Sequence, residues 1–284
     1  MHHSHNAFKT VALLGLLSSI LVLGGGALAG QRGVEYGLLV AVAMNFASYF
    51  FSDKIALATS GAQPLTPETA PAVYARVAPL VGGLAQKMGI PMPKLYVTPE
   101  PSPNAFATGR NPNNASVAFT EGILQLMTDS ELEGVVAHEL GHVLNRDILI
   151  SSIAGTIAAA ITALSRFAMF FGGGDRDERD RGSGLEALIM MILGPIAAML
   201  IQMAISRTRE YSADAASAKY LGTPQPLINA LGKLDTWSQR IPMEATPTTQ
   251  HLYIMKPLAG GSMMRLFSTH PSTEDRIRRL QEMR

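Results

Sequence analysis

The sequence predicts a mainly α-helical protein with a small β element, an α+β fold in which four transmembrane helices carry an aqueous domain. Three observations lead to this prediction. Of the 284 residues, 47% are hydrophobic and only 16% are charged, whereas about 25% is usual for soluble domains. Four long apolar runs divide the chain into membrane and aqueous parts. Helical spacing dominates the aqueous parts, where only two short runs have the character of strands.

Composition excludes several classes of protein. The net charge is +1, and no basic run reaches five residues, so the charge pattern of a nucleic-acid-binding protein is missing. We therefore expect no nucleic-acid partner. The chain has no cysteine, which excludes disulfides, thiolate metal sites and iron–sulfur clusters. His, Asp and Glu are left as the candidate strong metal ligands.

The first two apolar runs predict a transmembrane hairpin over residues 7–52. Residues 11–29 contain no charge, and as a helix they would rise about 28 Å, close to the ~30 Å of a bilayer core. Residues 34–51 contain one acid, Glu35, near their start. This second run ends in three aromatic residues at 49–51, as expected where a helix meets the membrane interface.

A secretory signal is the alternative interpretation of the first run. Lys9, the apolar stretch and the Ala27-Leu28-Ala29 ending resemble such a signal with its cleavage site. Cleavage after Ala29 would, however, leave only four residues before the second apolar run. A helical hairpin with a very short turn fits the pattern better.

The third and fourth apolar runs predict a second transmembrane hairpin, over residues 148–205. Arg166 lies near the end of the third run and can extend toward the headgroups. The fourth run contains Glu186 at its start and Pro195 inside, and a transmembrane helix tolerates such a proline as a kink.

Four membrane helices place both large aqueous segments on one side, where residues 53–147 and 206–284 form the two parts of one domain. Lys and Arg close to the membrane ends are more numerous on that side, which favours the cytoplasm. Residues 95–98 and 116–120 have strand character and are separated by a stretch rich in Pro, Asn and Gly.

Residues 128–147, TDSELEGVVAHELGHVLNRD, contain the motif that points to chemistry. Thr128 and Glu131 form the pattern of a capping box, and the apolar residues that follow have helical spacing. His138 and His142 are four residues apart on this helix, so both can bind one metal ion. Glu139 completes H-E-x-x-H, in which the histidines bind zinc and the glutamate acts as general base.

The alternative is that both histidines are simply packed at the edge of the core. A random chain of this composition would contain the pattern only roughly 0.008 times. Gly134 and Gly141 add support, because a glycine inside a helix costs about 1 kcal/mol and calls for a reason such as the close approach of another segment.

Glu210 is the predicted third metal ligand. Glu210 and Asp214 are four residues apart on one face of a predicted helix, where two carboxylates repel each other unless a cation lies nearby. Asp214 is expected to accept a hydrogen bond from a metal-binding histidine. The alternative for Glu210 is a solvated acid paired with Arg207.

The chain resembles the HtpX group of bacterial membrane zinc metalloproteases, which are related to the Ste24 and Oma1 proteases. The resemblance rests on HELGH at 138–142, E-x-x-A-D at 210–214 and the arrangement of four apolar runs. It also includes PNAFATG at 103–109 and THP at 269–271, followed by Arg276-Ile277. Nearly the whole chain is covered.

This resemblance implies a gluzincin-like domain with one Zn²⁺ per chain, bound by His138, His142 and Glu210. Glu139 would be the catalytic base, and His270 a further catalytic residue. The stretch 104–109 would lead an edge strand that binds an extended substrate by β-augmentation, although from residue types alone it is a turn. The substrate-binding residues would be Asn104, Ala105, Phe106 and Ala107.

The resemblance further implies a multi-pass protein of the bacterial inner membrane with its catalytic domain in the cytoplasm. There it would cut misfolded or damaged membrane proteins, in support of a membrane-bound AAA protease. A zinc-stabilised scaffold or chaperone without turnover is the alternative function, but it would not need Glu139. A transporter or channel would need paired charges inside the apolar runs, which contain little more than Arg166 and Glu186.

Overall fold

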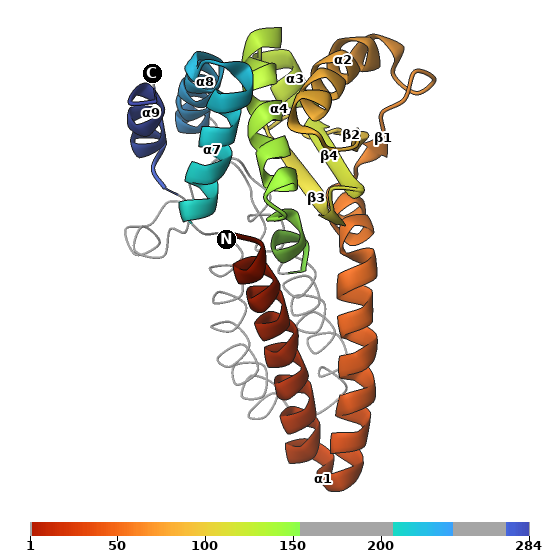
Figure 1. Cartoon of the computed structure of the whole chain (residues 1–284). Helices are drawn as coiled ribbons and strands as arrows, with labels where there is room; N and C mark the ends of the chain where they lie inside the picture. Colours follow the sequence, from red (N-terminus) through yellow and green to blue (C-terminus); the bar gives the residue numbers. More distant parts are fainter. Residues whose placement is uncertain (1, 154–206, 241–270, 284) are drawn as a thin grey trace.

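The computed structural model describes residues 2–153, 207–240 and 271–283 (Figure 1). A helical hairpin, α1 (His2–Thr59), extends from one end of a domain built of helices around a small sheet. The predicted mainly helical fold with a small β element is confirmed. Most of the third and fourth apolar runs lies outside the described residues, so the four membrane helices stay a prediction.

The two legs of α1 lie side by side, and the chain doubles back where Gly30 adopts a φ of +59°. The Asn45 side-chain amide donates to Ser18 Oγ across the legs, at 2.8 Å. At Gly37 a Cβ atom would lie 2.4 Å from the carbonyl oxygen of Leu21, so the close packing of the legs requires glycine. The hairpin therefore has the very short turn that the sequence favours over a cleaved signal.

Within the described residues, Gly30–Thr59 is the one helix long and apolar enough to cross a membrane. A shorter apolar helix, Thr10–Leu23, forms part of the other leg. Several large apolar side chains of α1 face outward, as a lipid environment requires. They are Val11, Leu23, Tyr36, Leu38, Leu39, Val40, Val42, Phe46, Tyr49, Phe50 and Phe51.

The sheet has four strands in the order β1-β2-β4-β3. The strands are β1 (Gln63–Pro64), β2 (Lys94–Thr98), β3 (Ala105–Asn111) and β4 (Asn114–Thr120). β2 and β4 pair in parallel, whereas β1–β2 and β3–β4 are antiparallel. Both strands predicted from residue types are confirmed as β2 and β4. β3, at the sheet edge, is a strand where residue types alone indicated a turn.

The helices of the domain pack on both sides of a central helix, α4 (Asp129–Leu144). α2 (Pro71–Met88) and the sheet cover one side, and α7 (Arg207–Leu221) and α8 (Gln225–Arg240) cover another. α3 (Glu121–Leu126) connects β4 to α4, and α9 (Thr273–Gln281) contacts α7 and α8.

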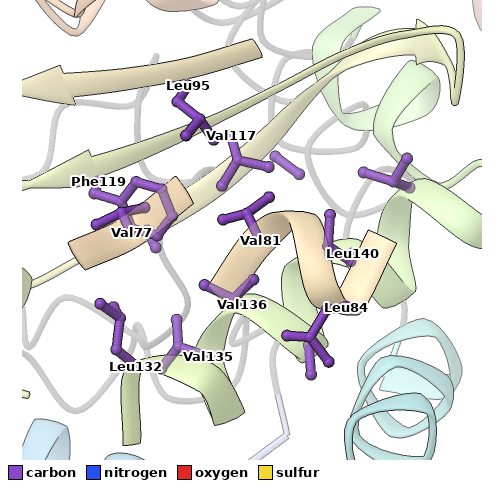
Figure 2. Close-up of a cluster of buried hydrophobic side chains, with 14 of the residues drawn as sticks. Val77, Val81, Leu84, Leu95, Val117, Phe119, Leu132, Val135, Val136 and Leu140 are labelled. Atoms are coloured by element: carbon purple, nitrogen blue, oxygen red, sulfur yellow. The ribbon is translucent and has the colours of Figure 1, made fainter. Parts of the chain in front are cut away.

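The hydrophobic core lies between α2, the sheet and α4 (Figure 2). Its side chains are buried, and each fully buried aliphatic or aromatic side chain contributes about 1.5–3 kcal/mol. The labelled members are Val77, Val81, Leu84, Leu95, Val117, Phe119, Leu132, Val135, Val136 and Leu140. This core fixes the position of α4 relative to β3.

The predicted capping box begins α4. The Thr128 hydroxyl accepts from the Glu131 backbone N–H, and the Glu131 carboxylate accepts from the Thr128 backbone N–H. Both helix glycines lie where another helix approaches, as expected. A Cβ at Gly134 would lie 2.6 Å from Leu227 N in α8, and one at Gly141 would lie 3.1 Å from Ala213 Cα in α7.

Candidate active site

Two helices bring three potential metal ligands together. His138 and His142 lie one turn apart on α4, and their rings are 4.8 Å apart, nearly perpendicular. Glu210 lies in the first turn of α7, with its carboxylate oxygens 3.7 Å from His138 Nε2 and 3.6 Å from His142 Nε2. One ligand atom from each residue lies within 4.8 Å of the others. The two segments, far apart in sequence, therefore meet as predicted.

The Nδ1 atoms of the two histidines each face a carboxylate. Asp214 Oδ1 lies 2.9 Å from His138 Nδ1, and Asp147 Oδ2 lies 3.2 Å from His142 Nδ1. Carboxylates in these positions favour the tautomer with hydrogen on Nδ1, which leaves each Nε2 with a lone pair. Both Nε2 lone pairs are then available on the side of Glu210.

These residues fit a zinc ion. Two ligands at about 2.0–2.1 Å from a tetrahedral Zn²⁺ are about 3.3–3.4 Å apart, only slightly less than the separations between Glu210 and the two histidines. Two histidines and one glutamate are also a ligand set of catalytic zinc sites, which keep a fourth position open.

Glu139 lies between the two histidines in sequence and faces the edge strand. It is buried, and its Oε2 accepts a hydrogen bond from the Ala107 backbone N–H at 2.9 Å. Burial raises the pKa of Glu139, and the charge of Glu210 acts in the same direction, outweighing the nearby histidines and the Ala107 N–H. A carboxylate with a raised pKa is suited to accept a proton and release it again.

Arg276 of α9 completes the buried part of the site. Its Nε donates to Asp214 Oδ2 at 2.9 Å, and its Nη2 donates to Asp214 Oδ1 at 2.6 Å. The Arg276 Nη1 lies 3.8 Å from Glu210 Oε2. Although burial opposes the charged form, these carboxylates raise the pKa of Arg276. Burial likewise opposes ionisation of Asp214, but Arg276 and His138 lower its pKa overall.

The charge balance around His142 favours a cation. Burial would lower the pKa of His142, but the hydrogen bond with Asp147 and the charge of Glu210 raise it to about 9. A positively charged group is thus stabilised at the meeting point of Glu210 and the histidines. A divalent metal bound to neutral imidazoles meets the same electrostatic demand.

Two residues of this site received no role from the sequence. Asp147 is five residues after His142 and three residues beyond the end of α4 at Leu144. This short distance in sequence was a local signal for its place near the histidine. Arg276 is 138 residues from His138. Its match to the family pattern at 276–277 was its signal in the sequence, and no role at the site was inferred from that match.

The predicted substrate-binding residues have different environments. Ala107 contacts Glu139 through its backbone, whereas the Phe106 side chain packs with Ala56 and Leu57 of α1. The Asn104 backbone N–H donates to Thr120 Oγ1, and its carbonyl accepts from the Thr120 N–H. Ala105 begins the strand and is buried. His270 lies outside the described residues.

Comparisons with known proteins give the family of this chain. Residues 71–284 match the model of Peptidase family M48. A protein named "Protease HtpX homolog" from Pelotomaculum thermopropionicum is 48% identical over 98% of this chain and 99% of its own length. One of the same name from Syntrophobacter fumaroxidans is 49% identical over 97% and 99%.

A solved structure shares the fold. Ste24p from S. mikatae superposes with a TM-score of 0.50 at 20% identity, over 98% of this chain. The chain spans 64% of the length of that protein. At this level of identity the similarity concerns the fold alone.

The helical fold and the His-His-Glu group against an edge strand define a metalloprotease of the H-E-x-x-H class. More specifically, the chain belongs to Peptidase family M48. It is a membrane metalloprotease with zinc as its cofactor.

Proposed function

We propose that this protein is a zinc endopeptidase of the bacterial inner membrane that cuts misfolded or damaged membrane proteins on the cytoplasmic side. The contact between Glu139 and the Ala107 N–H carries the proposal. It supports Glu139 as the general base, because this residue, next in sequence to His138, contacts the strand edge on which a substrate backbone can lie.

His138, His142 and Glu210 would hold the zinc ion, with Asp214 orienting His138. When bound, zinc acts as a Lewis acid that acidifies water and polarises the carbonyl of the bond to be cut. Glu139 accepts a proton from the attacking water, whose oxygen forms a bond to the carbonyl carbon. Glu139 then gives this proton to the leaving nitrogen as the C–N bond breaks.

β3 would bind the substrate as an added strand. Its inner side pairs with β4, whereas the Ala107 N–H points outward to Glu139. Because residues alternate along a strand, Ala105 shares the outward direction of Ala107. An extended peptide paired at these positions would take over the Ala107 N–H from Glu139 and pass in front of the Glu139 carboxylate. His270 stays a proposed catalytic residue, on the resemblance alone.

The same proposal covers the limits of the domains, the side of the membrane on which the catalytic domain lies, and the partners of the protein. The packing of α4 against α7 and α8 supports one catalytic domain from residues 53–147 and 206–284, separated by a second hairpin at 148–205. The outward apolar residues of α1 support the first hairpin at 7–52. The excess of Lys and Arg supports a cytoplasmic domain, where a membrane-bound AAA protease is the proposed partner.

Substitution of the general base tests this function. The native chain and Glu139→Gln, both in detergent with zinc, are given an unfolded soluble protein, and bound zinc is quantified in each. We expect cleavage to fall at least about a hundredfold in the variant, with one zinc per chain in both. Zinc removal by a chelator should abolish cleavage by the native chain. Full activity of Glu139→Gln would refute the assigned base.

The same experiment addresses the scaffold alternative. If both chains bind zinc and neither cuts the unfolded protein or a misfolded membrane protein, the silent scaffold becomes the better interpretation. Glu133→Gln, on the same helix but outside the metal-binding group, serves as the control.

A further inference from the structure

We propose that the enzyme selects peptide bonds next to a membrane helix of its substrate, within about six residues of the bilayer surface. This inference rests on the proposed function. Its basis is that β3, the proposed substrate strand, is fixed to the segments of this chain that enter the membrane. The zinc site therefore has a set height above the bilayer.

The middle of β3 packs on α1 just beyond its outward aromatic residues. Phe106 lies in one buried cluster with Ala56, Leu57 and Ala118. Ala56 and Leu57 follow Phe51 by five and six residues, which corresponds to about 8–9 Å along a helix. Since aromatic side chains at a helix end mark the membrane interface, β3 crosses α1 directly above that level.

The end of β3 descends to the aromatic residues themselves. The Arg110 guanidinium carbon lies 5.3 Å from the centre of the Phe50 ring. Lys54 Nζ lies 5.4 Å from the centre of the Phe51 ring. The cationic side chains of Arg110 and Lys54 therefore lie next to this aromatic pair. Ala107 precedes Arg110 by three residues, or about 10 Å of extended strand. With the length of the Arg110 side chain added, Glu139, bonded to the Ala107 N–H, is within about 20 Å of this level, or about six residues of extended chain.

A second attachment joins β3 to the third apolar run. The hydroxyls of Thr108 and Ser152 are 2.7 Å apart, and the Gly109 N–H donates to Ser152 Oγ at 3.3 Å. Thr108 and Ser152 are almost fully buried. Ser152 belongs to the helical stretch 148–153, which begins the third apolar run. β3 is therefore attached both to α1 and to the segment that follows α4.

The Ser152 contact also limits where a substrate can pair. Ala107 and Gly109 share the outward edge of β3. The Ala107 N–H is bonded to Glu139 and the Gly109 N–H to the buried Ser152. A substrate that takes over the Ala107 N–H from Glu139 can pair at Ala105 and Ala107, and it leaves the edge before Gly109, at the level of Phe50. A substrate whose own membrane helix begins at the level of Phe50 would leave the edge of β3 at this point.

Depth measurements test the position of β3. Because the chain has no cysteine, single cysteines can be introduced at Arg110, Lys54 and Ser130 of the full-length protein in vesicles. Each is labelled with a fluorophore, and quenching by a lipid carrying a nitroxide on its headgroup is measured. Ser130 is exposed and lies in the first turn of α4, eight residues and about 12 Å of helix before His138.

We expect quenching at position 110 to be within twofold of that at 54 and at least threefold above that at 130. Quenching at 110 equal to that at 130 would overturn the proposed height of β3.

A spacing series tests the consequence for cleavage. Single-span substrates carry one cleavable sequence at six or at 40 residues from the end of their membrane helix, in vesicles with the zinc-loaded enzyme. We expect the near site to be cut at least about threefold faster than the distant one. Equal rates at the two sites, or slower cleavage of the near site, would contradict selection next to the membrane.

A soluble unfolded protein carrying the same sequence separates the two proposals. If it is not cut either, the proposed endopeptidase function fails. If it is cut while the near membrane site is not, only the inference on membrane distance fails.

Discussion

Buried charges at the site are compensated by specific partners at short range. Asp214, with 2% of its side chain exposed, lies between His138 and Arg276. A charge buried without a partner would cost several kcal/mol. Arg276 therefore stabilises the carboxylate that orients a proposed zinc ligand.

Replacement of Arg276 should destabilise the protein strongly. In Arg276→Met the Asp214 carboxylate loses two hydrogen bonds in a buried setting, so we expect a loss of about 3 kcal/mol or more in the free energy of unfolding. Urea unfolding in detergent, with zinc present, measures this change. The matched control is Arg278→Met on the same helix, because Arg278 is 64% exposed. Equal urea midpoints for the two variants would contradict the role of Arg276.

At the scale of elements, one ion pair connects α4 to α8. Lys233 Nζ lies 2.6 Å from Glu131 Oε2, and the Glu131 side chain is 8% exposed. Burial alone would raise the pKa of Glu131. The hydrogen bonds from Lys233 and Thr128 outweigh burial and lower the pKa below its ordinary value.

This shift predicts a pH dependence of stability. A carboxylate with a lowered folded pKa stabilises the protein fully above its unfolded pKa of about 4.3. That contribution is lost as the pH falls through the lower folded value. Glu131→Gln should therefore be less stable than the native chain at pH 6, with the difference shrinking below pH 4. Urea midpoints at several pH values measure it, and a difference independent of pH would refute the linkage. Glu133→Gln is the control.

Close helix packing predicts opposite effects of one substitution at two glycines. Gly134→Ala places a methyl group against the backbone of Leu227, so we expect a loss of about 1–3 kcal/mol. Gly83→Ala in α2 meets no atom within 4 Å and should stabilise the helix by about 0.5–1 kcal/mol. Thermal unfolding of both variants checks the signs. A stabilising Gly134→Ala would contradict the described contact of α4 with α8.

These elements also show what the sequence could and could not predict. α4 was predictable because its cap, its apolar spacing and its histidines are all local signals. β3 was not predictable from residue types, since Asn and Gly favour turns and its pairing with β4 stabilises the strand. Arg276 depends on contacts between α9, α7 and α4. Such long-range packing leaves no periodic trace in the chain.

At the scale of the molecule, α1 combines an outward apolar surface with a firm attachment to the domain. Leu39 is 67% exposed in the middle of the candidate membrane helix. Leu39→Arg should disfavour membrane insertion by about 2.5–3.5 kcal/mol and lower the fraction that resists alkaline carbonate extraction. Ala58→Arg, at an exposed position near the end of α1, should extract like the native chain. Equal extraction of the two variants would argue against a membrane position for Leu39.

The active site is divided among α4, α7 and α9, and this division has a consequence for the fate of the enzyme itself. A copy whose helices have separated still carries the HELGH sequence, but without Glu210 and Arg276 beside it. Such a copy has lost its activity and has become an unfolded chain, the kind of protein that its intact neighbours are proposed to cut. The enzyme population would thereby remove its own damaged members.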